Sequence, residues 1–238
     1  MSEGIGPRII IKFSNGFFIT ETVIWAWIVI ACLIVFALLA TRKMKQNPKG
    51  LQAVAELIVE TVYKYVHDTM GKRNMAFAPF IGTVFMFLLI SNALGLIGFR
   101  PVTSDLNATF AMSFMVFFII QANSIRSKTL KGYLKHFIQP NPLLLPINIL
   151  EEFTFPVSLG FRLFGNILAG VIVMELIFKA LGWLSTEVMR LPVPLLQTVL
   201  PLPLNAFFDI FEPILQAFVF SMLTMAFIAK AIVSHDDH

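Results

Sequence analysis

The chain has 238 residues, of which 57% are hydrophobic and only 13% charged, and its mean hydropathy is +0.80. A soluble domain normally carries about a quarter charged residues, so this composition excludes an ordinary soluble domain and indicates an integral membrane protein. The net charge of +4 does not predict nucleic-acid binding, because the basic residues occupy short loops beside apolar segments, where membrane topology explains them. We therefore expect one transmembrane domain over residues 1–238, surrounded by the lipid bilayer.

The first predicted span covers about residues 22–40. A basic cluster of Arg42, Lys43, Lys45 and Lys49 follows it at once. Because cytoplasmic loops carry an excess of lysine and arginine, this end of the span is predicted to be cytoplasmic. The N-terminus would then lie on the outer side of the membrane.

Residues 51–70 predict an amphipathic helix rather than a span. Apolar residues recur at helical spacing, and the charged side chains Glu56, Glu60, Lys64 and Asp68 lie on the other faces. Such a helix is too charged to cross the bilayer. Two interpretations stay open: a helix that lies on the cytoplasmic membrane surface, and a helix packed on a soluble partner.

The second and third predicted spans cover about residues 77–99 and 107–123. A turn rich in Pro, Ser, Asp and Asn separates them, and a second basic loop follows the third span. The number of crossings between the two basic loops is even, so both fall on the same, cytoplasmic side, as the positive-inside rule expects. The second loop contains Arg126, Lys128, Lys131 and Lys135.

The last two predicted segments, about residues 143–181 and 204–233, are longer than a perpendicular crossing needs. Because about 20 residues cross the hydrocarbon, these segments must tilt, kink or extend beyond the bilayer. The sequence therefore predicts an all-α integral membrane protein with about five membrane-crossing helices and one amphipathic surface helix. The last two helices are expected to be long and tilted as a hairpin, and the C-terminus to be cytoplasmic.

Arg162 lies in the middle of the first long segment. An arginine at the centre of a span costs roughly 2.5–3.5 kcal/mol, so it is a functional candidate where it faces protein or water. The alternative is a structural arginine that snorkels to the interface, but Arg162 is far from either end of its segment. Ser158 and Asn166 share its helical face, and Glu151 returns to that face eleven residues earlier.

The second long segment carries a polar stripe of its own. Asn205, Asp209, Glu212 and Gln216 are spaced four, three and four residues apart, so on a helix they line one face. Two carboxylates one turn apart are costly to bury ionised, and one of them is expected to hold a proton. This suits a proton carrier and also resembles a cation site. For Asp209, a solvated helix end is an equal alternative.

Glu175 also lies within an apolar run, but on an ideal helix it points to a different face from Arg162. It is expected to line an aqueous inlet from the outer side, or else to pair with Lys179 four residues on. Gly165 and Ala169 are small residues, spaced by four, that permit close helix contact.

The sequence contains no nucleotide-binding loop, no zinc-ligand spacing and no serine-hydrolase motif. The histidines lie at predicted surfaces or in the C-terminal tail, so no metal site is expected. The sequence therefore predicts no catalytic residues, no metal and no cofactor.

Several motifs resemble a known family. The segment PVSLGFRLFGNILAG at residues 156–170 is similar to the signature of the a subunit of bacterial F-type ATP synthases, and LQAFVFSMLTM at residues 215–225 resembles a second motif of that subunit. The resemblance covers about residues 20–238, with its motifs in the same order. Further similar segments lie at residues 91–96, 101–107, 130–137 and 145–152, together with the His-rich C-terminus.

The resemblance implies a stator subunit that faces a rotating c-subunit ring and provides two offset half-channels for H⁺ or Na⁺. Its other implied partners are the b-subunit peripheral stalk and the remaining ATP synthase subunits. Such a chain would be a non-catalytic, ion-translocating subunit in the bacterial plasma (inner) membrane, and ATP chemistry would belong to other chains.

The resemblance also implies roles for individual residues. Arg162 matches the stator arginine, which draws the ring carboxylate into its ionised state and blocks a direct leak between half-channels. Gln216 matches the glutamine near that arginine. Asn166, Asp209 and Glu212 would line the outer half-channel, and Glu151 and Ser158 would lie toward the cytoplasmic one.

One position departs from the family pattern. Many members carry a carboxylate or imidazole nine residues after the arginine, where this chain has Val171, and Glu175 one turn on is the expected substitute. Asp209 stands where some relatives have a histidine, and the coupling ion stays open. A secondary transporter would predict internal repeats, which the sequence lacks, and a purely structural membrane anchor would not need charged stripes at mid-membrane.

Overall fold

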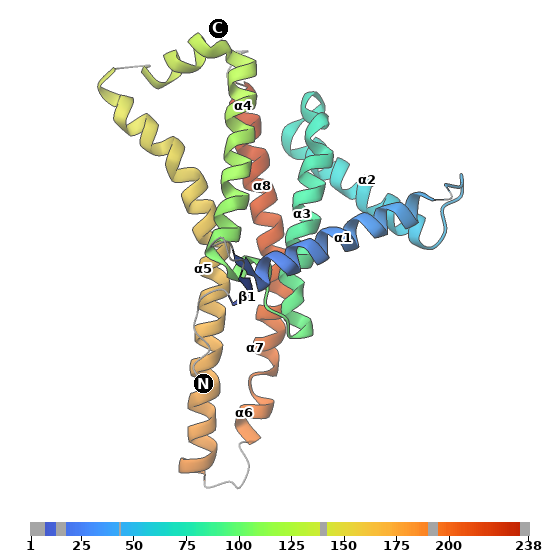
Figure 1. Cartoon of the computed structure of the whole chain (residues 1–238), viewed down its shortest axis with the longest axis vertical. Helices are drawn as coiled ribbons and strands as arrows, with labels where there is room; N and C mark the ends of the chain where they lie inside the picture. Colours follow the sequence, from blue (N-terminus) through green and yellow to red (C-terminus); the bar gives the residue numbers. More distant parts are fainter. Residues whose placement is uncertain (1–7, 13–17, 43, 139–141, 190–194, 234–238) are drawn as a thin grey trace.

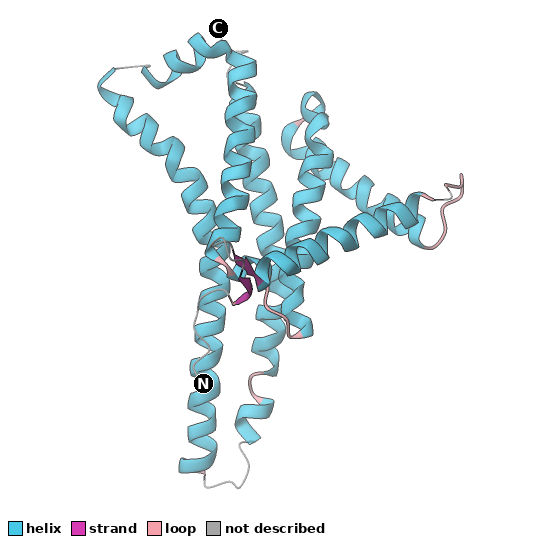
Figure 2. Cartoon of the chain, viewed as in Figure 1, coloured by secondary structure: helices cyan, strands magenta, loops and turns pink. Residues whose placement is uncertain are grey.

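The computed structural model describes residues 8–12, 18–42, 44–138, 142–189 and 195–233 (Figure 1). Most of these residues lie in helices, and two short strands near the N-terminus form an antiparallel hairpin (Figure 2). In chain order the strands and α-helices are β1 (Ile9–Lys12), β2 (Phe18–Thr20), α1 (Glu21–Thr41), α2 (Leu51–Met70), α3 (Ala78–Ala93), α4 (Leu106–Ile138), α5 (Leu145–Trp183), α6 (Leu195–Val199), α7 (Leu202–Ala206) and α8 (Glu212–Val233).

Short 3₁₀ and π turns connect several of these helices. The 3₁₀ turns are η1 (Lys72–Phe77), η2 (Leu94–Ile97), η3 (Val102–Ser104) and η4 (Pro142–Leu144). The π turns are η5 (Leu184–Val188) and η6 (Phe207–Phe211).

Five helical runs within the described ranges are long and apolar enough to cross a membrane. This confirms the predicted fold class, an all-α membrane protein with about five crossing helices. The hairpin of β1 and β2 is a small addition that the sequence reading did not predict. The five runs are Glu21–Thr41, Lys72–Ile97, Leu106–Arg126, Leu145–Glu187 and Leu196–Ala231.

The main core lies where α3, α4, α5 and α8 pack together (Figure 1). Leu88 of α3, Val116 of α4, Leu159 of α5 and Phe220 of α8 are almost completely buried there. A Cβ atom added at Gly160 of α5 would lie 3.0 Å from the Ser113 Oγ of α4. Glycine at this position therefore permits the close contact between α4 and α5, as small residues do in membrane helix pairs.

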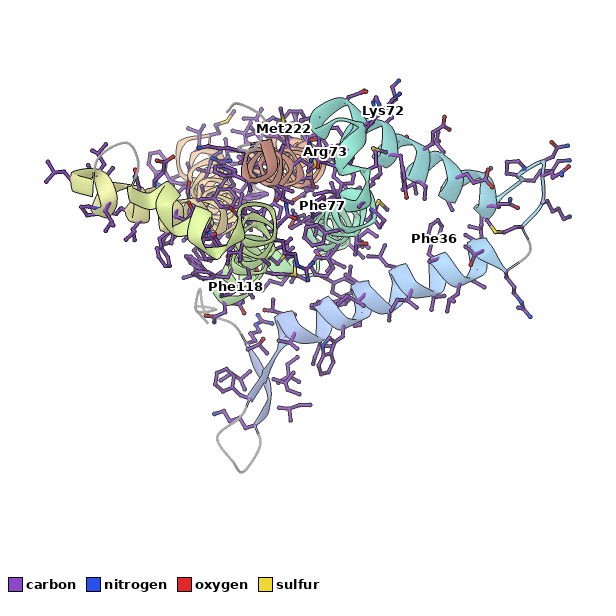
Figure 3. All side chains as sticks on the ribbon, turned by 90° about the horizontal axis from the view of Figure 1, so that it is seen from above. Phe36, Lys72, Arg73, Phe77, Phe118 and Met222 are labelled. Atoms are coloured by element: carbon purple, nitrogen blue, oxygen red, sulfur yellow. The ribbon has the colours of Figure 1, made fainter. Side chains whose placement is uncertain are left out.

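Helix α1 is steeply inclined to α4, α5 and α8 in Figure 1, and seen from above it lies apart from the main helix group in Figure 3. It joins the rest of the chain through a second cluster, in which Val29 packs with Leu94 and Val102. Trp25 also stacks on Phe99 with ring centroids 4.2 Å apart. Because α1 and the long helices are not parallel, they cannot all follow the membrane normal.

Helix α2 packs on the chain's own bundle through its C-terminal half. Val66 and Met70 are buried in the main core, and the Tyr65 ring stacks on Phe218 of α8 at 5.3 Å. This burial raises the pKa of Tyr65 to about 12. The N-terminal half of α2 instead exposes apolar side chains, including Leu57 at 63%. The sequence left two surroundings open for this helix, the membrane surface and a soluble partner. The structure adds a third, because the C-terminal half of α2 packs against α3 and α8 of the same chain.

The C-terminal part of α4 bends sideways at the end of the bundle, toward the start of α5 (Figure 1). The Tyr133 hydroxyl donates to the Gln121 Oε1 at 2.6 Å, although twelve residues separate them. In a straight helix twelve residues span about 18 Å, beyond the reach of these side chains. The hydrogen bond therefore fixes the bend, and burial together with the charge of Glu152 raises the pKa of Tyr133.

Candidate functional site

A cavity of about 780 Å³ lies among α5, η6, α8, the connection between α3 and α4, and the N-terminal segment. Its apolar lining comes mainly from α5, with Phe164, Ile167 and Leu168 among the residues that contribute. The cavity also concentrates polar and charged side chains. These are Arg8, Glu21, Asn92, Arg100, Ser104, Glu175, Asn205, Asp209, Glu212 and Gln216.

The polar stripe predicted for the last segment lines this cavity in full: Asn205, Asp209, Glu212 and Gln216 are all part of its surface. The helix that carries them is not the uninterrupted α-helix that the spacing assumed. Asn205 lies in α7, Asp209 in the π turn η6, and Glu212 begins α8. Wider π turns are typical of functional sites, and here the turn keeps Asp209 and Glu212 on the cavity side.

Glycines bring the carboxylates close to neighbouring backbone. A Cβ atom at Gly170 of α5 would lie 3.0 Å from the Phe208 Cδ1 and 3.5 Å from the Glu212 Oε2. A Cβ atom at Gly95 would lie 3.9 Å from the Asp209 Oδ1. Both carboxylates therefore face surfaces from which side chains are missing.

The close contacts of α5 differ from the predicted ones. The sequence pointed to Gly165 and Ala169, but no atom lies within 4 Å of a Cβ added at Gly165, and Ala169 is exposed. The close approaches occur at Gly160, Gly170 and Gly182 instead. The reason is rotational: the face of α5 that carries Gly165 and Ala169 points away from the chain's other helices.

Gln216 and Asn92 are buried amide side chains of the cavity, exposed by only 4% and 3%. Among the described residues, the Gln216 Oε1 and the Asn92 Nδ2 have no hydrogen-bond partner. The Asn92 Oδ1 accepts a short hydrogen bond from the Thr103 Oγ1. Since buried polar atoms normally find partners, these two point to water or another polar group in the cavity. The sequence reading did not select Asn92, although an asparagine within an apolar span was an available signal.

Glu175 fits both of the roles that the sequence left open. It lines the cavity together with Val171, one turn before it. Its Oε1 also accepts from the Lys179 Nζ at 2.6 Å, in a pair whose side chains are both more than 60% exposed. Exposed pairs of this kind contribute little to stability, so the contact leaves Glu175 available to the cavity.

Arg162 lies outside the cavity, on the exposed face of α5. No ion pair joins it to a carboxylate within the described part of the chain. Ser158 is exposed on the same face, whereas Asn166 is half-buried and does not belong to the cavity lining. Farther along this face, Ala169, Val173 and Leu176 are exposed as well.

The two adjacent glutamates near the start of α5 have different surroundings. Glu151 is exposed and faces Lys230 of α8, with 3.8 Å between its Oε1 and the lysine Nζ. Glu152, which the sequence reading did not select, is half-buried, and its Oε1 accepts a short hydrogen bond from the Gln121 Nε2. Glu152 therefore belongs to the Tyr133 and Gln121 network that fixes the bend of α4.

Within the described ranges, no three His, Cys, Asp or Glu side chains gather in a way that could hold a metal ion. The cavity instead combines carboxylates, amides and guanidinium groups, all of which can form hydrogen bonds with water. Such an arrangement can hold water and pass a proton between carboxylates.

Comparison with known proteins places the chain in a family. The family described as "ATP synthase A chain" matches residues 23–229. The chain is 34% identical over 218 residues to "ATP synthase subunit a" of Moorella thermoacetica, covering 91% of this chain and 93% of the relative. It is 36% identical to "ATP synthase subunit a 1" of Hahella chejuensis, covering 90% and 84% of the two chains.

A third relative comes from a chloroplast. The chain is 35% identical over 227 residues to "ATP synthase subunit a, chloroplastic" of Stigeoclonium helveticum, covering 90% of this chain and 85% of the relative. The family match over residues 23–229 and the identities of about 35% over most of each chain lead to the same conclusion. The chain belongs to the ATP synthase subunit a family.

Proposed function

We propose that this chain is the stator that passes H⁺ or Na⁺ to and from a rotating c-subunit ring through two offset half-channels. The observation that carries the proposal is the position of Arg162. It is a charged side chain near the middle of a membrane-spanning run, exposed, and without a carboxylate partner among the described residues. Because a charge at such a depth is costly without a partner, the partner is expected on another chain. A carboxylate of the c-ring supplies it.

The cavity is the outer half-channel in this proposal. It is lined by the start of α1 and by the connection between α3 and α4. The basic residues Arg42 and Arg126 lie at the opposite ends of α1 and of the membrane-crossing part of α4. By the positive-inside rule those ends are cytoplasmic, so the cavity opens to the outer side and the N-terminus lies there too.

The inner half-channel runs along the exposed face of α5 on the cytoplasmic side of Arg162. Ser158 and Glu151 occupy this face, both exposed. Arg162 lies between the two half-channels, so its charge blocks direct passage and favours the ionised form of the ring carboxylate. Gln216 reaches the cavity from α8, and Asn166 lies one turn from Arg162 on α5.

The coupling arithmetic explains why a rotating ring is needed. One elementary charge that crosses 100 mV releases about 2.3 kcal/mol, so several ions must be summed for each ATP. The chain itself would be non-catalytic, with ATP chemistry on other subunits and a b-subunit stalk holding it in place. Its location would be the bacterial plasma membrane.

The test is Arg162→Ala in the assembled complex, with ATP-driven ion pumping and passive leak measured in inverted vesicles. We expect pumping to be lost while ATP hydrolysis persists, because the ring carboxylate loses its ionising partner. Lys64→Ala, which removes an exposed cation on α2, is the matched control and should pump like the parent. Near-normal pumping by the Arg162→Ala complex would contradict the proposal.

A further inference from the structure

The N-terminal segment contributes a permanent positive charge to the cavity. Arg8 lies just before β1 and lines the cavity, as does Glu21, the first residue of α1. The backbone amide of Glu21 donates to the Arg8 carbonyl oxygen at 2.9 Å. The Trp25 Nε1 donates to the Glu21 Oε1 at 3.4 Å, and Trp25 stacks on Phe99. The main-chain hydrogen bond therefore places the Arg8 backbone beside the start of α1, at the cavity.

Arg8 and Glu21 lie before the part of the chain that matches the family. The match begins at residue 23, whereas the carboxylates of α5, η6 and α8 all fall inside it. The N-terminal contribution to the cavity is therefore a property of this chain that family membership does not assign.

The cavity has a mixed charge. Two guanidinium groups line it together with four carboxylates, and they come from six different parts of the chain. The six ionisable residues are Arg8 of the N-terminal segment, Glu21 of α1, Arg100 between η2 and η3, Glu175 of α5, Asp209 of η6 and Glu212 of α8. Lys179, which pairs with Glu175 at 2.6 Å, adds a further positive charge nearby.

A guanidinium stays charged at every pH at which the protein is folded. In a shared, partly enclosed space it stabilises the ionised form of the carboxylates and repels cations. Both effects act in the same direction, because each lowers the occupancy of the cavity by a proton or a metal cation. The positive charge at Arg8 should therefore raise the ion activity at which the carboxylates of the cavity are half-occupied.

We infer that Arg8 is a positioning residue of the outer cavity, which sets the coupling-ion affinity of Asp209 and Glu212 through its charge. The inference rests on the proposed function, since it assigns Arg8 to the outer half-channel. Arg8 itself takes no part in ion transfer. Ions move on the carboxylates, and Arg8 determines the ion activity at which those carboxylates load.

The experiment uses the whole ATP synthase in proteoliposomes, with ATP synthesis driven by a fixed potassium diffusion potential. The pH of the lumen is titrated, and the lumenal Na⁺ concentration at fixed pH if synthesis depends on Na⁺. Arg8→Gln should reach its half-maximal rate at an ion activity about threefold lower, a shift of roughly half a pH unit for one removed charge across a hydrated cavity. Arg8→Lys keeps the charge and should restore the parental midpoint.

Lys12→Gln is the matched control. Lys12 is an exposed cation at the end of β1 in the same hairpin, but it does not line the cavity. Its variant should have the parental midpoint. Because Arg8 is itself exposed, Arg8→Gln should assemble normally, and Arg8→Ala serves as a second neutral variant.

Three results would overturn the inference: an unshifted midpoint in Arg8→Gln and Arg8→Ala, an equal shift in Lys12→Gln, or a shift in Arg8→Lys as large as in Arg8→Gln. These are distinguishable from failure of the proposed function. If Arg162→Ala still pumps, the stator role is wrong. If Arg162→Ala is uncoupled while Arg8→Gln is unshifted, only the role of Arg8 is wrong.

Discussion

Gly170 and Gly165 lie five residues apart on α5, but a methyl group added at each would meet different surroundings. At Gly165 it would meet nothing within 4 Å, whereas at Gly170 it would press on Phe208 at 3.0 Å. We expect Gly165→Ala to stabilise the chain by about 0.5–1 kcal/mol, because alanine costs less backbone entropy in a helix. Gly170→Ala should instead destabilise it by about 1 kcal/mol or more through overpacking.

Thermal unfolding of the purified chain in detergent micelles, followed by tryptophan fluorescence, measures both variants under the same conditions. The pair controls for helix propensity, since both substitutions are glycine to alanine within one helix. Equal unfolding temperatures for the two variants would show that α5 and η6 are not in close contact at Gly170.

At the scale of the element, the bend of α4 depends on a small hydrogen-bond network. Tyr133 donates to Gln121, which donates to Glu152 of α5. Tyr133→Phe removes the hydroxyl donor and should cost about 1 kcal/mol of local stability. Backbone amides near the C-terminal end of α4 should then exchange hydrogen about fivefold faster, as measured by mass spectrometry.

Tyr63→Phe is the control for this prediction, because Tyr63 is 42% exposed on α2. It should leave hydrogen exchange in α4 unchanged. If Tyr133→Phe also leaves exchange unchanged, the network does not hold the bend, and other contacts of the bent segment must do so.

The π turn η6 is the element that sequence periodicity missed. The spacing of Asn205, Asp209, Glu212 and Gln216 fits an ordinary helix, and nothing in their identity reports a wider turn. Wide turns form where tertiary contacts compensate for poorer hydrogen-bond geometry. Here Phe208 lies against Gly170 and Asp209 lies near Gly95, contacts that exist only once α5 and the α3–α4 connection are in place.

At the scale of the whole molecule, α1 can be tested with the single cysteine of the sequence. Cys32 lies near the middle of α1 and is exposed. If α1 crosses the bilayer, a spin label at Cys32 should be accessible to oxygen and protected from a water-soluble nickel complex, because oxygen concentrates in hydrocarbon. Power-saturation electron paramagnetic resonance in liposomes makes this measurement.

A label moved to Met44, just past the end of α1 and 72% exposed, is the control and should show the reverse pattern. Equal nickel accessibility at both positions would mean that α1 does not cross the membrane. In that case α1, which is steeply inclined to α5 and α8 in Figure 1, would not be a membrane-crossing helix.

The whole molecule also separates two kinds of polar residue that the sequence grouped together. Asp209, Glu212 and Gln216 face an internal cavity, whereas Arg162 and Ser158 lie on an open face of α5. The first set can hold water within the chain. The second is exposed, and for Arg162 the partner is expected on another subunit.

The sequence by itself determined the fold class, the approximate spans and the family resemblance, because long apolar runs and mid-span charges are local properties of the chain. The stripe from Asn205 to Gln216 was likewise readable from spacing. Only the tertiary structure decided which helix faces meet, since membrane helices are apolar all round and periodicity cannot mark the inner face. For that reason only the structure places the close contacts of α5 at Gly160, Gly170 and Gly182, and only it shows Arg8 and Asn92 at the cavity.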